Sequence, residues 1–113
     1  HIIAAYAAFY AKAQARTAPI LLLARQAAAA DPQAAEVWDQ MNAERLTGMT
    51  HFAADLHRKR LLRKGVPARK ARDILWAYTS VELYELLVIR QEWTIRMFRE
   101  FLTQALSAAL LDD

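Results

Sequence analysis

Glu44, His51 and Asp55 are the residues whose types and spacing come closest to a metal site. They are separated by seven and four residues, so they project from one side of a helix. Imidazole and carboxylate groups are suitable ligands for a divalent cation. The large apolar residues of the same segment project from the opposite side, however, so these three polar groups are expected to lie in water. We therefore predict no metal site and no cofactor.

Catalytic motifs are also missing from the sequence. Ser80 and Ser107 have no histidine and carboxylate nearby in the pattern that nucleophilic catalysis needs. The chain has no G-x-S-x-G turn, no glycine-rich phosphate loop and no metalloprotease motif. These observations predict that the protein is not an enzyme.

A set of aromatic, sulfur-containing and hydroxyl side chains is better suited to binding than to catalysis. Ordinary core packing explains each of them singly, but bulky aromatics facing alanine-rich helices can leave an apolar cavity. Methionine adapts to varied ligand shapes, and the hydroxyl groups of Tyr10, Tyr78 and Thr79 would supply polar contacts. We predict a small apolar or amphipathic ligand. The candidate ligand-binding residues are Tyr6, Phe9, Tyr10, Trp38, Met41, Met49, Phe52, Trp76, Tyr78 and Thr79.

Most of the positive charge lies between His57 and Arg72. This segment has eight basic residues and no acid, which leaves seven basic and twelve acidic residues elsewhere and a net charge of +3. A solvated turn is the favoured interpretation, because cations stabilise the C-terminus of a helix. Contact with an acidic protein surface and nucleic-acid binding are the alternatives. No aromatic residue alternates with the charges as a base-stacking groove would require, and binding to phosphates would depend steeply on salt.

The elements that position these residues are predicted to be helices. Only two glycines and three prolines interrupt the chain, and β-branched residues form no alternating run. Apolar spacing and proline positions predict helices over about 2–15, 18–29 and 31–62, the last starting at the N-cap Asp31 and Pro32. A fourth helix follows Pro67, and a fifth begins at Thr94. One face of the first helix is predicted to pack against the core. It carries Ile2, Ile3, Tyr6, Phe9, Tyr10 and Ala13. We expect one all-α domain over 1–113, an antiparallel bundle of about five helices.

Composition places the chain among soluble helical domains. At 113 residues it buries about two-thirds of its unfolded surface, enough for one core. The mean hydropathy is 0.00, and no apolar run approaches the roughly 20 residues of a membrane span. The opening HIIAAYAAFYAKAQA lacks the basic leader of a secretory signal, and its first residue suggests a fragment. Cysteine is absent, in agreement with the cytoplasmic location that we predict.

The last two predicted helices carry more apolar surface than one short chain can cover. Residues 73–88 are apolar around the whole helical wheel, and residues 93–111 have one broad apolar face. A helix apolar all round must be buried all round, which predicts a homodimer with a four-helix interface from these two helices. Phe98→Asp is expected to dissociate it. The predicted interface residues are Leu83, Tyr84, Leu87, Met97, Phe98, Phe101, Ala105 and Ala108.

These C-terminal residues also resemble a known family. The run DILWAYTSVELYELLV at 73–88, followed by Trp93, Phe98 and residues 102–106, resembles the end of the regulatory domain in TetR-type bacterial transcriptional regulators. The likeness extends upstream through Phe9-Tyr10, Pro19 with its leucine run, Ala30-Asp31-Pro32 and Gly48-Met49. Family members commonly have a glycine just before the tryptophan and a proline near position 81, where this chain has Glu92 and Val81.

The resemblance implies a function. In that family an N-terminal helix-turn-helix binds operator DNA, and the C-terminal helical domain dimerises and holds a small-molecule effector between its helices. Nothing in these 113 residues resembles the DNA-reading head, so operator DNA would be contacted through a missing N-terminal domain. Two alternatives remain open: a stand-alone helical homodimer that serves as an interaction module, and a nucleic-acid binder that uses the basic segment.

Overall fold

A computed structural model describes residues 2–112, which form an all-α fold. Its helices are α1 (Ile2–Ala28), α2 (Pro32–Arg58), α3 (Ala68–Tyr78), α4 (Val81–Tyr84), the π-helix η1 (Glu85–Arg90) and α5 (Ile95–Leu110). The predicted fold class is confirmed. One isolated antiparallel bridge joins Leu62 to Leu111. None of the helices in the described range is long and apolar enough to cross a membrane.

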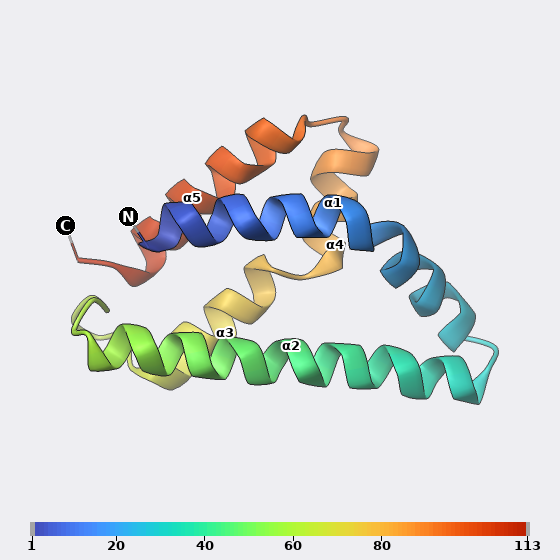
Figure 1. The fold of residues 1–113 in the computed structure, drawn as a ribbon, viewed down its shortest axis with the longest axis horizontal. Helices are drawn as coiled ribbons and strands as arrows, with labels where there is room; N and C mark the ends of the chain where they lie inside the picture. The colour runs from blue at the N-terminus through green and yellow to red at the C-terminus, as the bar shows by residue number, and fades with distance from the viewer. Residues whose placement is uncertain (1, 113) are drawn as a thin grey trace.

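The helix α1 lies between α5 and α2 (Figure 1). The two long helices α1 and α2 run in opposite directions, and α3 packs against both α2 and α5. The short α4 contacts α1 and continues directly into η1. The first half of the chain therefore builds a long helical hairpin, and the second half covers it from α3 to α5.

The helix α1 is one element and contains Pro19 in its interior. The prediction of two separate helices over 2–15 and 18–29 is therefore wrong. Proline has no N–H to donate, and its ring clashes with the carbonyl group four residues earlier, so it bends a helix that continues past it. The second half of α1 does change direction and runs toward the start of α2 (Figure 1).

The predicted inward stripe of α1 is only part of its buried surface: Ile3 is buried and Ile2, Tyr6 and Tyr10 pack against the core, but the alanines beside them are buried more completely. The fully buried positions are Ile3, Ala7, Ala11 and Ala18, together with the polar Gln14. Ala7, Ala11 and Ala18 pack in one cluster with large residues of α4 and α5. Small side chains on one helix allow bulky side chains of its neighbour to fill the space between them at the density of a protein interior. The predicted inward position of Phe9 is wrong, because that side chain is 69% exposed.

Local signals set the ends of α2. The Asp31 side chain accepts a hydrogen bond from the backbone N–H of Gln33 at 2.9 Å, which confirms the predicted N-cap. The helix ends at Arg58, short of the predicted Leu62. Arg60 adopts a positive φ of 58°, and the N–H of Leu61 donates back to the carbonyl of Leu56, a left-handed termination that satisfies the last carbonyl groups.

The predicted fourth helix is interrupted between α3 and α4. The Ser80 side chain accepts from the N–H of Leu83 at 3.4 Å and starts α4, so Thr79 and Ser80 separate the two helices. The break before α5 is confirmed: Glu92 has a φ of 57°, and Thr94 Oγ1 accepts from the N–H of Met97 at 3.1 Å.

Several predicted interface residues are already covered by their own chain. Phe98 is 0% exposed, and its ring meets that of Tyr84, also buried, edge to face at 5.5 Å. Their assignment to a surface between copies is therefore corrected, because no part of Phe98 is left for a partner. Leu83, Leu87, Phe101 and Ala105 are half-buried, whereas Met97 and Ala108 are exposed. Phe98→Asp would place a charge in the core of its own chain and would report on folding, not on dimerisation.

Candidate ligand-binding site

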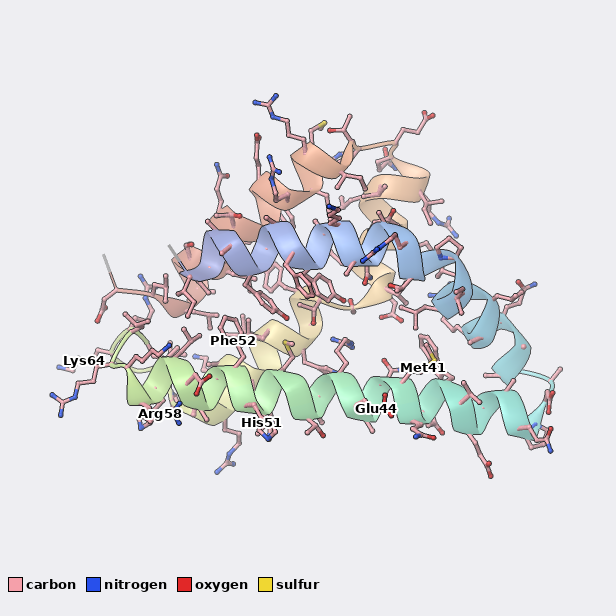
Figure 2. The ribbon with its side chains drawn as sticks, in the orientation of Figure 1. Met41, Glu44, His51, Phe52, Arg58 and Lys64 are labelled. Carbon is pink, nitrogen blue, oxygen red and sulfur yellow. The ribbon has the colours of Figure 1, made fainter. Side chains whose placement is uncertain are left out.

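A cavity of about 410 Å³ lies between α1, α2 and the junction of α3 with α4. Its wall is mostly apolar, and a few polar side chains converge on it. Met41 points from α2 toward α1, as does Phe52 farther along the helix (Figure 2). The lining residues are Tyr10, Ala13, Gln14, Thr17, Leu21, Trp38, Met41, Asn42, Glu44, Arg45, Thr79 and Val81. This combination of apolar wall and few polar groups is typical of a small-molecule site.

Four of the predicted ligand-binding residues line this cavity: Tyr10, Trp38, Met41 and Thr79. Three others, Tyr6, Met49 and Phe52, pack against one another beside it. The Tyr6 hydroxyl donates to Met49 Sδ at 3.2 Å, and the Tyr6 and Phe52 ring centroids are 4.5 Å apart. These contacts make them part of the core between α1 and α2, outside the cavity lining.

The remaining three predicted residues lie elsewhere. Phe9 faces solvent, and Tyr78 packs against Phe101 of α5 with 6.3 Å between the ring centroids. Trp76 is partly exposed on α3, and the guanidinium carbon of Arg45 lies 5.2 Å from its ring centroid. Trp76 is therefore outside the cavity lining and contacts two residues of that lining, Arg45, whose side chain reaches over its ring, and Thr79, whose hydroxyl lies 3.4 Å from its carbonyl oxygen.

Gln14 is the polar residue that the sequence interpretation missed. It is 2% exposed, and its Nε2 atom has no hydrogen-bond partner among the described residues. A buried donor without a partner destabilises a fold by about 1–3 kcal/mol, so such groups are rare. The signal was present in the sequence: Gln14 continues the helical spacing of Ile3, Ala7 and Ala11, which are all buried along α1.

Arg45 joins α2 to the junction of α3 and α4. Its Nη1 donates to Thr79 Oγ1 at 2.8 Å and to the carbonyl oxygen of Trp76, and its Nη2 donates to Asn42 Oδ1 at 3.5 Å. Burial lowers the pKa of this guanidinium below its usual value. Among residues 2–112, no carboxylate lies within ion-pair distance of Arg45. The wall thus carries a cation that no acidic side chain neutralises at close range.

Tyr10 meets the same junction from α1. Its hydroxyl donates to the carbonyl oxygen of Thr79, and burial raises its pKa from 10.0 to about 12, with the nearby Arg45 charge acting in the opposite direction. Burial also raises the pKa of Tyr6, one turn away on α1. Tyr10 and Arg45 therefore hold the Thr79 segment from two different helices.

The polar residues considered for a metal site do not assemble. Glu44 Oε1 accepts from Gln40 Nε2 at 3.2 Å, and Asp55 pairs with Arg58. His51 points from α2 away from α1 (Figure 2). Within residues 2–112, no group of three histidine, aspartate or glutamate side chains could hold a metal ion.

The basic segment lies at the end of α2, in the following turn and at the start of α3, and Figure 2 shows Lys64 at the end of the molecule far from Met41. It does not contribute to the cavity lining.

No protein-family model, no curated protein and no solved structure matches the chain. The chemistry of the site is therefore argued from its own residues.

Gln14→Met should stabilise the unliganded protein. Methionine keeps the length of the side chain but removes the unpartnered donor, so we expect the free energy of unfolding to rise by about 1 kcal/mol in urea denaturation. Gln104→Met, at an exposed position of α5, is the matched control and should change stability by less than about 0.5 kcal/mol. A Gln14→Met protein no more stable than this control would show that the amide is satisfied in solution.

Stability should fall as the pH rises above 10. A tyrosine whose pKa is raised to about 12 in the folded state stabilises the fold fully below pH 10 and loses that contribution between pH 10 and 12. Between pH 8 and pH 11 we expect Tyr10 to account for a loss of about 1 kcal/mol. Urea denaturation at both values should give a smaller loss for Tyr10→Phe than for the wild type. Equal losses would contradict the assigned burial of the Tyr10 hydroxyl.

Proposed function

We propose that this chain is the effector-binding and dimerisation domain of a TetR-like bacterial transcriptional repressor. The observation that carries the proposal is the cavity of about 410 Å³ between α1, α2 and the junction of α3 with α4, with its largely apolar wall and the unpartnered Gln14 amide nitrogen. A domain whose only task was to pack against another protein would gain nothing from a buried donor that it leaves unsatisfied.

Two backbone positions support the resemblance to this family. Family members commonly have a glycine before the tryptophan, and Glu92 at that position has a φ of 57°, a conformation that glycine adopts without strain. They also have a proline near position 81, and Val81 is the first residue of α4, where proline is well tolerated. Glu92 and Val81 thus stand at positions where the backbone conformation suits the glycine and the proline that family members have.

Exposed apolar residues on η1 and α5 support dimerisation. Leu86 and Ile89 on η1 and Met97 on α5 are each about half exposed in the single chain. Exposed apolar side chains on neighbouring helices favour association with a second copy. In the proposed regulator the dimer holds two DNA-reading heads, carried outside these 113 residues, at a spacing of about 34 Å. An effector that binds one dimer geometry more tightly shifts that spacing and weakens operator binding by the same coupling energy.

The stand-alone dimer module and the nucleic-acid binder are less well supported. An interaction module explains the exposed apolar residues but not the cavity. A nucleic-acid binder explains the basic segment, of which Arg58 and Arg72 already pair with the neighbouring acids Asp55 and Asp73. Neither alternative requires a ligand, so ligand binding separates them from the proposed regulator.

A neutral apolar dye should bind in the cavity. We expect Nile red to fluoresce on titration with the wild-type protein and to quench Trp38, which lines the cavity. Ala13→Phe should abolish binding, because the larger side chain fills the space beside Gln14. Ala5→Phe, at an exposed position of the same helix outside the cavity lining, is the control and should bind as the wild type does. Equal binding by both variants would place the dye elsewhere and remove the support for a sensor domain.

The chain should also sediment as a dimer at micromolar concentration. Met97→Asp should dissociate it, because burying an unpaired charge at an apolar interface costs roughly 3 kcal/mol or more. Since Met97 is exposed in the single chain, the variant should retain its helical circular dichroism. Phe9→Asp also replaces an exposed apolar side chain with aspartate, but on α1, and it should leave the dimer intact. A folded wild-type monomer in sedimentation velocity would refute the dimerisation part of the proposal.

A further inference from the structure

The geometry points to one chemical class of ligand: a small carboxylate-bearing amphiphile. We infer that its apolar body lies against Leu21, Trp38 and Met41, and that its carboxylate accepts hydrogen bonds from Gln14 Nε2 and the Arg45 guanidinium. This inference rests on the proposed function, because it names the kind of effector that the same cavity takes.

Two sets of unused hydrogen-bond donors reach the cavity wall. Gln14 lines the cavity, and its Nε2 atom is covered by protein and has no acceptor among the described residues, so a rotation of the amide toward the cavity would let a ligand oxygen satisfy it. The guanidinium of Arg45 carries five N–H donors. Its hydrogen bonds to Trp76, Thr79 and Asn42 use three of them, which leaves two within the part of the chain that the structure describes. The unused N–H groups of the amide and the guanidinium favour a ligand group that accepts hydrogen bonds.

The charge of the wall favours an anion over a neutral acceptor. Arg45 is partly buried, and burial alone disfavours its charged form. A carboxylate beside it would offset this cost of burying the charge and would make charge-assisted hydrogen bonds, which are about twice as strong as neutral ones. Within residues 2–112 no acid takes that place at ion-pair distance.

One acidic residue also lines the cavity, and its position limits its effect. Glu44 is exposed, and its side chain is engaged by Gln40 on the outer part of α2. An exposed charge is screened by water and salt, whereas a partly buried charge such as Arg45 is screened much less. Glu82 also acts electrostatically on Arg45, but it is exposed, lies outside the cavity lining and pairs with Arg25. The guanidinium is therefore the least screened charge at the cavity wall, and a ligand amine is disfavoured there.

The residues that line the cavity also constrain the polarity of the rest of the ligand. Leu21 of α1 and Trp38 and Met41 of α2 give the wall apolar surface, and Gln14, Arg45 and Thr79 give it polar groups. A ligand that fits both must have an apolar body with a single polar end. A highly charged or fully polar metabolite would leave the apolar surface in contact with water, and a pure hydrocarbon would leave the Gln14 amide unsatisfied.

Three probes with one hydrocarbon tail and different heads test the inference: decanoate, decanol and decylamine. Dissociation constants for the intact chain are measured below the critical micelle concentration by displacement of Nile red. We expect decanoate to bind at least tenfold more tightly than decanol, and decylamine to bind more weakly than either. Ala13→Phe should remove the binding of decanoate, which locates it in the cavity.

Variants of Gln14 and Arg45 show which of these side chains binds the polar head group of the probe. Arg45→Gln should reduce the decanoate preference over decanol to less than threefold, and Arg45→Lys should retain part of it because the charge remains. Gln14→Met should lower the decanoate affinity several-fold with little change for decanol. Arg99→Gln, at an exposed position outside the cavity, is the control and should keep the full preference. The ratio of the two constants is insensitive to a general loss of stability.

The possible results separate this inference from the proposed function. Equal affinities for decanoate and decanol, with binding still blocked by Ala13→Phe, would overturn the carboxylate inference and leave the ligand-sensing function standing. A decanoate preference that persists in both Arg45→Gln and Gln14→Met would also overturn it, because the head would then bind elsewhere. The absence of binding by all three probes and by Nile red would refute the ligand-binding function itself.

Discussion

The bend of α1 is the constraint on which the arrangement of the domain depends. Pro19 lies inside this helix, and a proline that continues a helix must deflect it because one hydrogen bond is lost and the ring needs room. The first half of α1 packs its alanines under α5, and the second half turns toward the start of α2 (Figure 1). The cavity is lined by residues on both sides of this bend, including Thr17 and Leu21.

The same few hydrogen bonds hold the fold and shape the candidate site. Tyr10 of α1 and Arg45 of α2 both bond to Thr79, and Ser80 after it caps α4. α4 leads directly into η1, which carries exposed apolar residues. A ligand that engaged Arg45 would therefore act on the residue next to the start of α4. This gives the proposed coupling between effector and dimer a short physical route, with Thr79 as the shared contact.

Sequence patterns predicted the helices wherever the signal was local. The all-α class follows from apolar spacing and the scarcity of glycine and proline, whereas the starts of α2 at Asp31 and of α5 at Thr94 depend on side chains that hydrogen-bond within a few residues of themselves. On α1 the prediction of Phe9 as an inward residue was wrong and the buried alanines were missed, because large aromatic residues were given more weight than alanine. Phe98 was assigned to a surface between copies for a similar reason: periodicity shows which face of a helix is apolar but not which neighbour covers it.

The sequence by itself thus determined the helical class, the caps and the apolar faces, since each follows from residues close together along the chain. It also identified Tyr10, Trp38, Met41 and Thr79 as candidate ligand contacts, although not what separates them from Tyr6 or Trp76. Only the tertiary structure decided that α5 covers the alanines of α1, that Gln14 is buried without a partner, and that Arg45 reaches Thr79 across 34 positions of sequence. These outcomes depend on contacts between distant segments, and their free energies come from packing and desolvation that no local pattern records.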